Sequence, residues 1–230
     1  MNINDILTEI EYTKERSAKE LFEFFAQKEK ELIAWSSGQP QKIKHKELSK
    51  GLPDKFAHEL APFAYYAKTY YSDIPNVKFK PCCGSEQYDG IIIDNGPEIL
   101  VEITNAIFGE EWAVMKEVLA EKGIAPWAYD ILGVNKKNRA EKKKEAIDII
   151  AGGEERKQVD HIFELRKLVK KATEDKCVKS LDALLPYGQN KTILIVTFDD
   201  TIIRPSTSKE KWDDFVNFKH SEINSMKHNF

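Results

Sequence analysis

The spacing of hydrophobic residues predicts helices toward both ends of the chain and a group of strands between them. In five segments apolar residues recur every three or four positions, which gives a helix one buried face. These segments are 17–35, 54–71, 110–122, 155–176 and 209–225. Four shorter segments are dominated by apolar and β-branched residues, as strands are; they cover 77–82, 87–94, 98–104 and 192–198. A sixth helix could cover 139–150, and the whole pattern predicts a mixed α/β fold.

Local sequence signals refine this pattern. Asp-Asn-Gly-Pro at 94–97 has the residues that tight turns need, so the second and third strands are expected to form a hairpin. Pro62 should kink or split the second helix, because proline has no N–H to donate. Strand 192–198 is expected to be fully buried, and Trp112 and Phe163 are expected on the buried faces of their helices.

The predicted hairpin carries two acidic residues in otherwise apolar surroundings. Asp89 precedes three isoleucines, and Glu102 lies between Val101 and Ile103. Two carboxylates that point to the same side of a hairpin near one end can bind a divalent cation. Burying them unpaired is unfavourable, so a metal, a basic partner or exposure must compensate. The alternative interpretation is that Asp89 and Gly90 form a turn or bulge and that no metal binds.

The order of the elements extends this site hypothesis. A helix with Glu59, a strand, a strand with Asp89, a strand with Glu102, a helix and strand 192–198 follow one another. This order resembles the core of the PD-(D/E)XK, or restriction-endonuclease-like, nuclease superfamily over about residues 54–198. The resemblance implies a restriction-endonuclease-like mixed central sheet flanked by helices. It also implies that Asp89 and Glu102 bind Mg²⁺ (or Mn²⁺), that Glu59 adds a third carboxylate, and that the protein hydrolyses DNA, with RNA as the other candidate.

The chain departs from the superfamily pattern at one position. The superfamily has a lysine two residues after the second acid, but Thr104 stands there, so the signature is D-x12-E-x-T. A threonine can hold a water molecule but supplies no positive charge. We expect Lys80 on the first strand to complete the site, with Lys78 and Lys116 as alternatives. Members without the lysine can be inactive, so the alternative function is a nuclease-fold module that binds nucleic acid or protein.

Charge is unevenly distributed along the chain. The net charge is −3, but residues 136–176 contain 13 basic and 9 acidic residues. Basic residues at this density could neutralise phosphates, although a solvated helical face is the alternative interpretation. The residues that we expect to contact nucleic acid are Lys142, Lys143, Lys144, Arg166 and Lys170.

These features suggest an N-terminal helical extension at 1–53, a nuclease-like core at 54–204 that includes the basic segment, and a C-terminal helix at 205–230. No apolar run reaches the roughly 18 residues of a membrane span, and residues 1–17 do not have the pattern of a signal peptide. We therefore expect a cytoplasmic protein that avoids membranes. Restriction-type enzymes often dimerise, so the resemblance also implies a homodimer as a candidate assembly.

Motifs of several other protein classes are missing from the sequence. The sequence contains no GxxxxGK[ST], GxGxxG or GxSxG motif, which argues against P-loop NTPases, dinucleotide-binding folds and α/β-hydrolases. Three cysteines, two of them adjacent, indicate free thiols in a reducing compartment rather than disulfides. No CxxC or HxxxH spacing indicates a zinc site.

Overall fold

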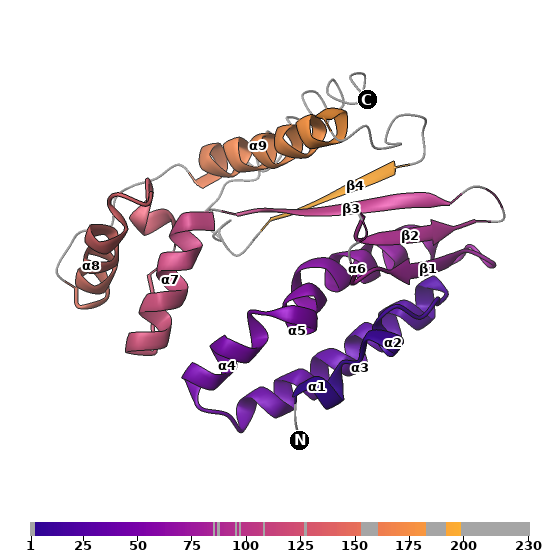
Figure 1. Cartoon of the computed structure of the whole chain (residues 1–230), viewed down its shortest axis with the longest axis horizontal. Coiled ribbons are helices and arrows are strands. Elements are labelled where there is room, and N and C mark those ends of the chain that lie inside the picture. Colours follow the sequence, from indigo (N-terminus) through magenta and orange to yellow (C-terminus); the bar gives the residue numbers. More distant parts are fainter. Residues whose placement is uncertain are drawn as a thin grey trace. The chain divides into compact units, whose positions relative to one another are not determined.

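A computed structural model of the chain describes most of the first 152 residues and two later segments (Figure 1). The described residues are 3–84, 86, 88–94, 96, 98–107, 109–126, 128–152, 161–182 and 192–198. They divide into two compact units. The sheet unit contains the described residues among 1–105 and 174–197, and the helical unit contains those among 106–173 together with Phe198.

The sheet unit begins with helices and ends in a four-stranded sheet. Its helices are α1 (Ile3–Ile6), α2 (Glu9–Tyr12), α3 (Ala18–Ser37), α4 (Gln41–Leu48), α5 (Gly51–Lys55) and α6 (Ala61–Tyr71), with a π-helical turn at Phe56–Leu60. Its strands are β1 (Lys78–Pro81), β2 (Gly90–Ile93), β3 (Ile99–Ala106) and β4 (Thr192–Phe198). The four predicted strands and the helix at 17–35 are therefore confirmed.

The sheet has the strand order β1-β2-β3-β4. β1 pairs antiparallel with β2, and β2 pairs antiparallel with β3 as the predicted hairpin. β4 lies beside β3 and runs in the same direction, so the sheet is mixed (Figure 1). β2 begins at Gly90 rather than at residue 87, which places Asp89 just before the strand instead of inside it.

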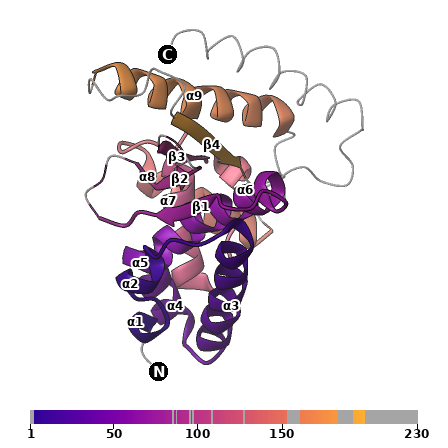
Figure 2. The same ribbon diagram turned by 90° about the vertical axis from the view of Figure 1, so that its right-hand side faces the viewer.

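One face of the sheet is covered by α3 and α6 (Figures 1 and 2). Phe63, Ala64 and Ala67 of α6 are fully buried and share one apolar core with Phe79 of β1 and Ile92 of β2. Helix α3 starts with a capping box in which Ser17 and Glu20 exchange hydrogen bonds. The face opposite this core carries Glu102, the charged residue of β3.

Pro62 explains why the predicted second helix is split. In a regular α-helix residue 62 would donate to the carbonyl of His58, but proline has no N–H and its ring clashes there. The chain instead widens into the π turn, where the Ala61 N–H donates to the Phe56 carbonyl, five residues back. The predicted kink or split is confirmed, and the helical segment begins at Gly51, three residues earlier than expected.

The predicted N-terminal extension is part of the sheet unit. Ile3, Ile6 and Tyr12 are buried in the same core as the sheet residues. Arg16 forms an isolated antiparallel bridge with Phe79 of β1, with N···O distances of 3.0 and 2.7 Å. This bridge covers part of the outer edge of β1 and so reduces its exposure to other chains.

The helical unit has a smaller core of its own. It contains α7 (Gly109–Lys122), a 3₁₀ turn at Ala128–Ile131, α8 (Arg139–Ile150) and the first part of α9 (His161–Asp182). The core residues share almost complete burial; they are Val114, Val118, Ile131, Val134 and Ala146. The helices predicted at 110–122 and 139–150 are confirmed.

Some sequence expectations about burial and extent are wrong. The side chains of Trp112 and Phe163 are 36% and 53% exposed rather than buried, because Val114 and Leu165 occupy the inner faces of their helices instead. All residues of β4 are half-buried rather than fully buried. Residues 155–160 of one predicted helix and the predicted helix at 209–225 lie outside the described residues. Within the described part of the chain, no helix is long and apolar enough to cross a membrane.

Candidate functional site

The β2–β3 hairpin brings Asp89 close to Glu102. Gly90 pairs with Val101, and the Asp89 N–H also donates to the Val101 carbonyl, so Asp89 and Gly90 both lie opposite Val101, as the two residues of a β-bulge do. Val101 and Ile103 are buried in the core, so Glu102 points to the opposite face. The Asp89 carboxylate lies near it, because it accepts from the Ile103 N–H and the charge of Glu102 raises its pKa. The structure therefore has the bulge of the alternative interpretation, and the placement of both carboxylates on one side of the hairpin stays a prediction.

Asp89 makes two backbone hydrogen bonds and one side-chain hydrogen bond directly before β2. Its carbonyl accepts from the Cys82 N–H at 2.9 Å, and its own N–H donates to the Val101 carbonyl at 2.9 Å. Its Oδ2 accepts from the Ile103 N–H at 2.7 Å. The carboxylate thus takes the place of a backbone acceptor, which fixes its orientation beside β3.

Gly90 follows Asp89 because a larger residue does not fit there. A Cβ atom at this position would lie 2.6 Å from Cε1 and 3.0 Å from Cζ of Phe63. The Phe63 ring is fully buried and therefore requires the close approach of a glycine backbone. Packing against Phe63 therefore explains why residue 90 is a glycine. The neighbouring Asp89 supplies the carboxylate of the candidate site.

Glu59 lies on the π turn that leads into α6. Its Oε2 is buried and has no hydrogen-bond partner among the described residues, although the Lys55 ammonium lies 3.5 Å away. Burial raises the pKa of Glu59 to about 6, and the negative charge of Asp89 adds to this rise, while Lys55 opposes it. The influence of Asp89 brings the predicted helix carboxylate into the electrostatic neighbourhood of the hairpin site.

The pKa of Asp89 is also shifted by burial and by neighbouring charges. Burial raises the pKa of Asp89, and the charge of Glu102 raises it further. The hydrogen bond from Ile103 and the charges of Lys176 and Lys55 act in the opposite direction. Asp89 therefore interacts electrostatically with both Glu59 and Glu102, and two lysines partly compensate its charge.

Lys176, a residue that was not identified from the sequence, contributes a positive charge to the candidate site. It lies on α9, and its ammonium group donates to Glu102 Oε2. The Glu102 side chain is only 14% exposed, so this ion pair is largely shielded from solvent. Lys176 is 74 residues from Glu102 along the chain, and no spacing rule connects residues at that separation.

The lysines expected from the sequence have other neighbours. Lys80 on β1 pairs in register with Ile91, and its charge lowers the pKa of the Cys82 thiol against the larger effect of burial. The Lys78 ammonium lies 4.0 Å from Glu20. Lys116 belongs to the helical unit, with its ammonium 5.9 Å from the ring centre of Trp112. The role expected for Lys80 stays a prediction.

Thr104 lies two residues after Glu102 and is half-buried on β3. Strand alternation places its side chain on the same face as that of Glu102. Its carbonyl accepts a hydrogen bond from the Thr197 hydroxyl at 3.4 Å, and this hydroxyl also contacts Asn105 Oδ1. The backbone at Thr104 thus helps to hold β4 beside β3.

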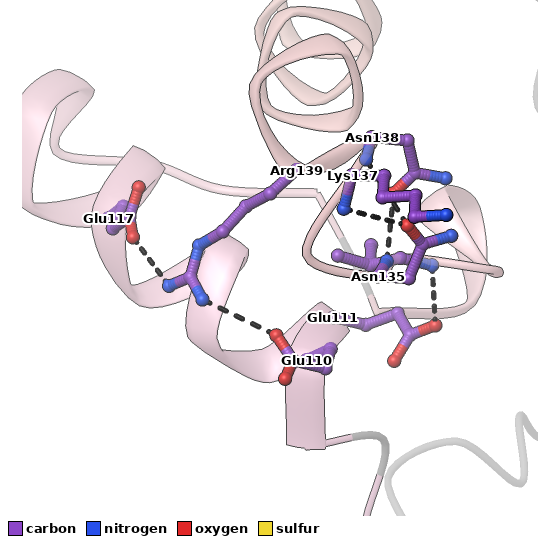
Figure 3. A network of polar contacts seen from close by, with 8 residues as sticks. Glu110, Glu111, Glu117, Asn135, Lys137, Asn138 and Arg139 are labelled. Atoms are coloured by element: carbon purple, nitrogen blue, oxygen red, sulfur yellow. Dashed lines mark hydrogen bonds and ion pairs between the residues drawn. The ribbon is translucent and has the colours of Figure 1, made fainter.

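The basic segment of the helical unit is rich in ion pairs (Figure 3). Arg139 bridges Glu110 at 3.3 Å and Glu117 at 2.6 Å. Lys143 lies within 3.7 Å of Glu117, and Lys142 lies 2.6 Å from Glu145. The remaining predicted contacts differ in exposure: Lys144 and Lys170 are exposed and Arg166 is half-buried. Ion pairs of this kind are typical of a solvated helical face. Phosphate binding by Lys142, Lys143, Lys144, Arg166 and Lys170 stays a prediction.

The carboxylates have the chemistry but not the arrangement of a formed metal site. Among the residues that the structure describes, no three histidine, cysteine, aspartate or glutamate residues form a group that could hold a metal ion. Asp89, Glu102 and Glu59 nevertheless offer oxygen ligands of the kind that Mg²⁺ prefers. A divalent cation would supply a partner for the buried Oε2 of Glu59, which has no hydrogen bond among the described residues, and would lower the raised pKa values of Glu59 and Asp89.

Comparison of the chain with protein-family models, with curated proteins and with solved structures returned no match.

Proposed function

We propose that the protein is a metal-dependent nuclease that hydrolyses phosphodiester bonds in DNA. The observation that carries this proposal is the meeting of Asp89, Glu102 and Lys176 at the end of the β2–β3 hairpin. The mixed sheet with the order β1-β2-β3-β4 agrees with the restriction-endonuclease-like core that the sequence resembles. The free thiols of Cys82 and Cys83 fit a cytoplasmic enzyme.

In this proposal Asp89 and Glu102 hold Mg²⁺ or Mn²⁺, with Glu59 as a third oxygen donor. The ion, when bound, polarises the phosphate and lowers the pKa of a water molecule. The carboxylates fit this role because burial and mutual repulsion raise the pKa values of Asp89 and Glu59. A bound cation would stabilise their ionised forms.

Lys176 supplies the positive charge that position 104 does not have. Its ammonium group reaches Glu102 from α9 and can donate to a water molecule or to a phosphate oxygen at the same place. Glu59 can also position a water molecule by accepting a hydrogen bond from it. Thr104 can orient a water molecule through its hydroxyl group. The basic residues of α8 and α9 would contact the DNA backbone.

Cleavage assays with matched variants test this proposal. Labelled single-stranded DNA, duplex DNA and RNA are incubated with the full chain and Mg²⁺, Mn²⁺ or EDTA. The test variants are Glu102→Gln, Asp89→Asn and Lys176→Met, and Lys30→Met, an exposed change on α3, is the control. We expect metal-dependent cleavage by the wild type and the control, and a loss of about 10²-fold or more in each test variant.

Urea unfolding of each variant shows whether a loss of cleavage reflects chemistry or folding. Cleavage that persists in EDTA, or in folded Glu102→Gln and Asp89→Asn, would overturn the nuclease proposal.

The second candidate is a catalytically inactive nuclease-fold protein that binds nucleic acid or protein. The observation that favours it is the Lys176–Glu102 ion pair, which already neutralises the carboxylate that a metal would use. Binding of DNA that is unaffected by metal ions or by Glu102→Gln, without cleavage of any substrate, would support this candidate.

A further inference from the structure

Tyr12 connects the N-terminal helices to the candidate site. It is the last residue of α2 and is completely buried. Its hydroxyl group donates to the Lys55 carbonyl at 3.4 Å, a long hydrogen bond between residues 43 positions apart. Lys55 is the residue directly before the π turn. A residue of the N-terminal segment therefore contacts the backbone that presents Glu59.

The surroundings of the hydroxyl group are those of the site. Burial strongly raises the pKa of Tyr12, and the charges of Glu59, Cys83 and Asp89 raise it further. The hydroxyl group therefore remains a hydrogen-bond donor at physiological pH. Since its acceptor is a backbone carbonyl, Tyr12 acts on the position of the turn rather than on the charge of a carboxylate.

The π turn needs such support because it is the least regular part of the helical segment. Its widened turn follows from Pro62; Lys55 directly precedes it and Glu59 lies within it. The Lys55 ammonium lies 3.5 Å from Glu59 Oε2. A shift of the Lys55 backbone would move both members of this pair relative to Asp89.

We propose that Tyr12 is a positioning residue, whose buried hydroxyl group holds the Lys55 carbonyl and thereby fixes the Lys55–Glu59 pair beside Asp89. This inference rests on the proposed metal-dependent function, in which Glu59 is an oxygen donor. Residues that orient metal ligands from behind commonly contribute about tenfold or more to metal affinity. The N-terminal helices are then part of the functional centre.

Titration of Mn²⁺ into the full-length protein by calorimetry tests the proposal. The variants are Tyr12→Phe, which removes only the hydroxyl group, Glu102→Gln, and Tyr71→Phe as the matched control. Tyr71 lies at the end of α6 and packs edge-to-face on Phe79, with ring centroids 5.3 Å apart. We expect Mn²⁺ to bind about tenfold more weakly to Tyr12→Phe and within about twofold of wild type to Tyr71→Phe. Wild-type affinity in Tyr12→Phe would overturn the positioning role.

Two further measurements distinguish a failure of the proposed metal site from a failure of the positioning role of Tyr12. If Glu102→Gln also keeps wild-type affinity, the metal site and with it the proposed function are wrong. A thermal-unfolding cycle of Tyr12→Phe, Glu59→Gln and the double variant examines positioning without any metal. We expect the changes in Tm to be non-additive, because both substitutions act on the same turn. Additive changes in Tm would show that Tyr12 and Glu59 are independent, which would also overturn the proposal.

Discussion

Replacement of Gly90 by alanine tests the packing that places Asp89. The new Cβ would lie 2.6 Å from Cε1 and 3.0 Å from Cζ of Phe63. Carbon atoms attract best at about 3.5–4.0 Å, so the methyl group or the ring must move by roughly 1 Å. The ring is completely buried and packs edge-to-face on Phe79 with centroids 5.6 Å apart. There is therefore little space into which it could move.

The expected sign of this change distinguishes packing from chain entropy. Without a clash, alanine would stabilise a strand position by about 0.4–1 kcal/mol, because glycine loses more backbone freedom on folding. Overpacking of a filled core costs about 1–3 kcal/mol. We therefore expect Gly90→Ala to lower the free energy of unfolding by about 1–2 kcal/mol, measured by urea denaturation.

A second substitution and a control make this test specific. Phe63→Leu removes ring atoms from the clash, so it should cost less stability in the Gly90→Ala background than in the wild type. Gly109→Ala is the control, because no atom lies within 4 Å of its added Cβ, and it should be neutral or slightly stabilising. Wild-type stability of Gly90→Ala, or additive effects with Phe63→Leu, would refute the packing argument.

Three other changes follow from the structure. The pKa of Glu59 is raised from its ordinary value of 4.5 to about 6, so the folded state binds this proton before the unfolded state does. The unfolding free energy of wild type should therefore rise relative to Glu59→Gln as the pH falls from about 7 to 4.5, and parallel pH curves in urea would contradict this. Glu111→Ala removes a buried carboxylate that accepts hydrogen bonds from two backbone N–H groups at 2.9 and 3.1 Å. Calorimetry should show that the free energy of unfolding falls by about 3 kcal/mol. Arg139→Ala is expected to lower it by less than about 1 kcal/mol, and an equally small effect of Glu111→Ala would contradict this prediction. Burial raises the pKa of the Cys82 thiol to about 11, so iodoacetamide at pH 8 should label Cys82 only after denaturation. Peptide mass spectrometry detects the label, and labelling of Cys82 in the folded protein would contradict its burial.

The hairpin could be predicted from the sequence because its signals are local. A turn sequence at 94–97 joins two apolar runs, and the antiparallel pairing of these strands then brings Asp89 near Glu102. Pro62 likewise predicts an interruption of the helix, which the structure has in the turn directly before this residue. In these cases one short stretch of sequence contains the whole physical cause.

Lys176 could not be predicted because its role depends on a distant contact. Helical periodicity indicates which residues of 161–182 share a face, but not which strand that face meets. Burial was misjudged for a related reason. Trp112 and Phe163 lie at helical positions that suit a core, yet smaller neighbours fill the space, and only the packing partner decides between them.

The helical unit interrupts the sheet unit along the chain, and this order has consequences during protein synthesis. When a ribosome has completed residues 1–105, β3 is present but β4 is not, since β4 begins at Thr192. The outer edge of β3 is then an unpaired strand edge of the kind that associates with other chains. At 5–20 residues per second, the roughly 90 intervening residues take about 5–20 s to make. Glu102 is made before this interval and Lys176 within it, so the nascent chain contains the carboxylates of the candidate site before Lys176 exists. Chaperone protection should matter most in this interval, and the candidate site can acquire its final charge only after residue 176 has been translated.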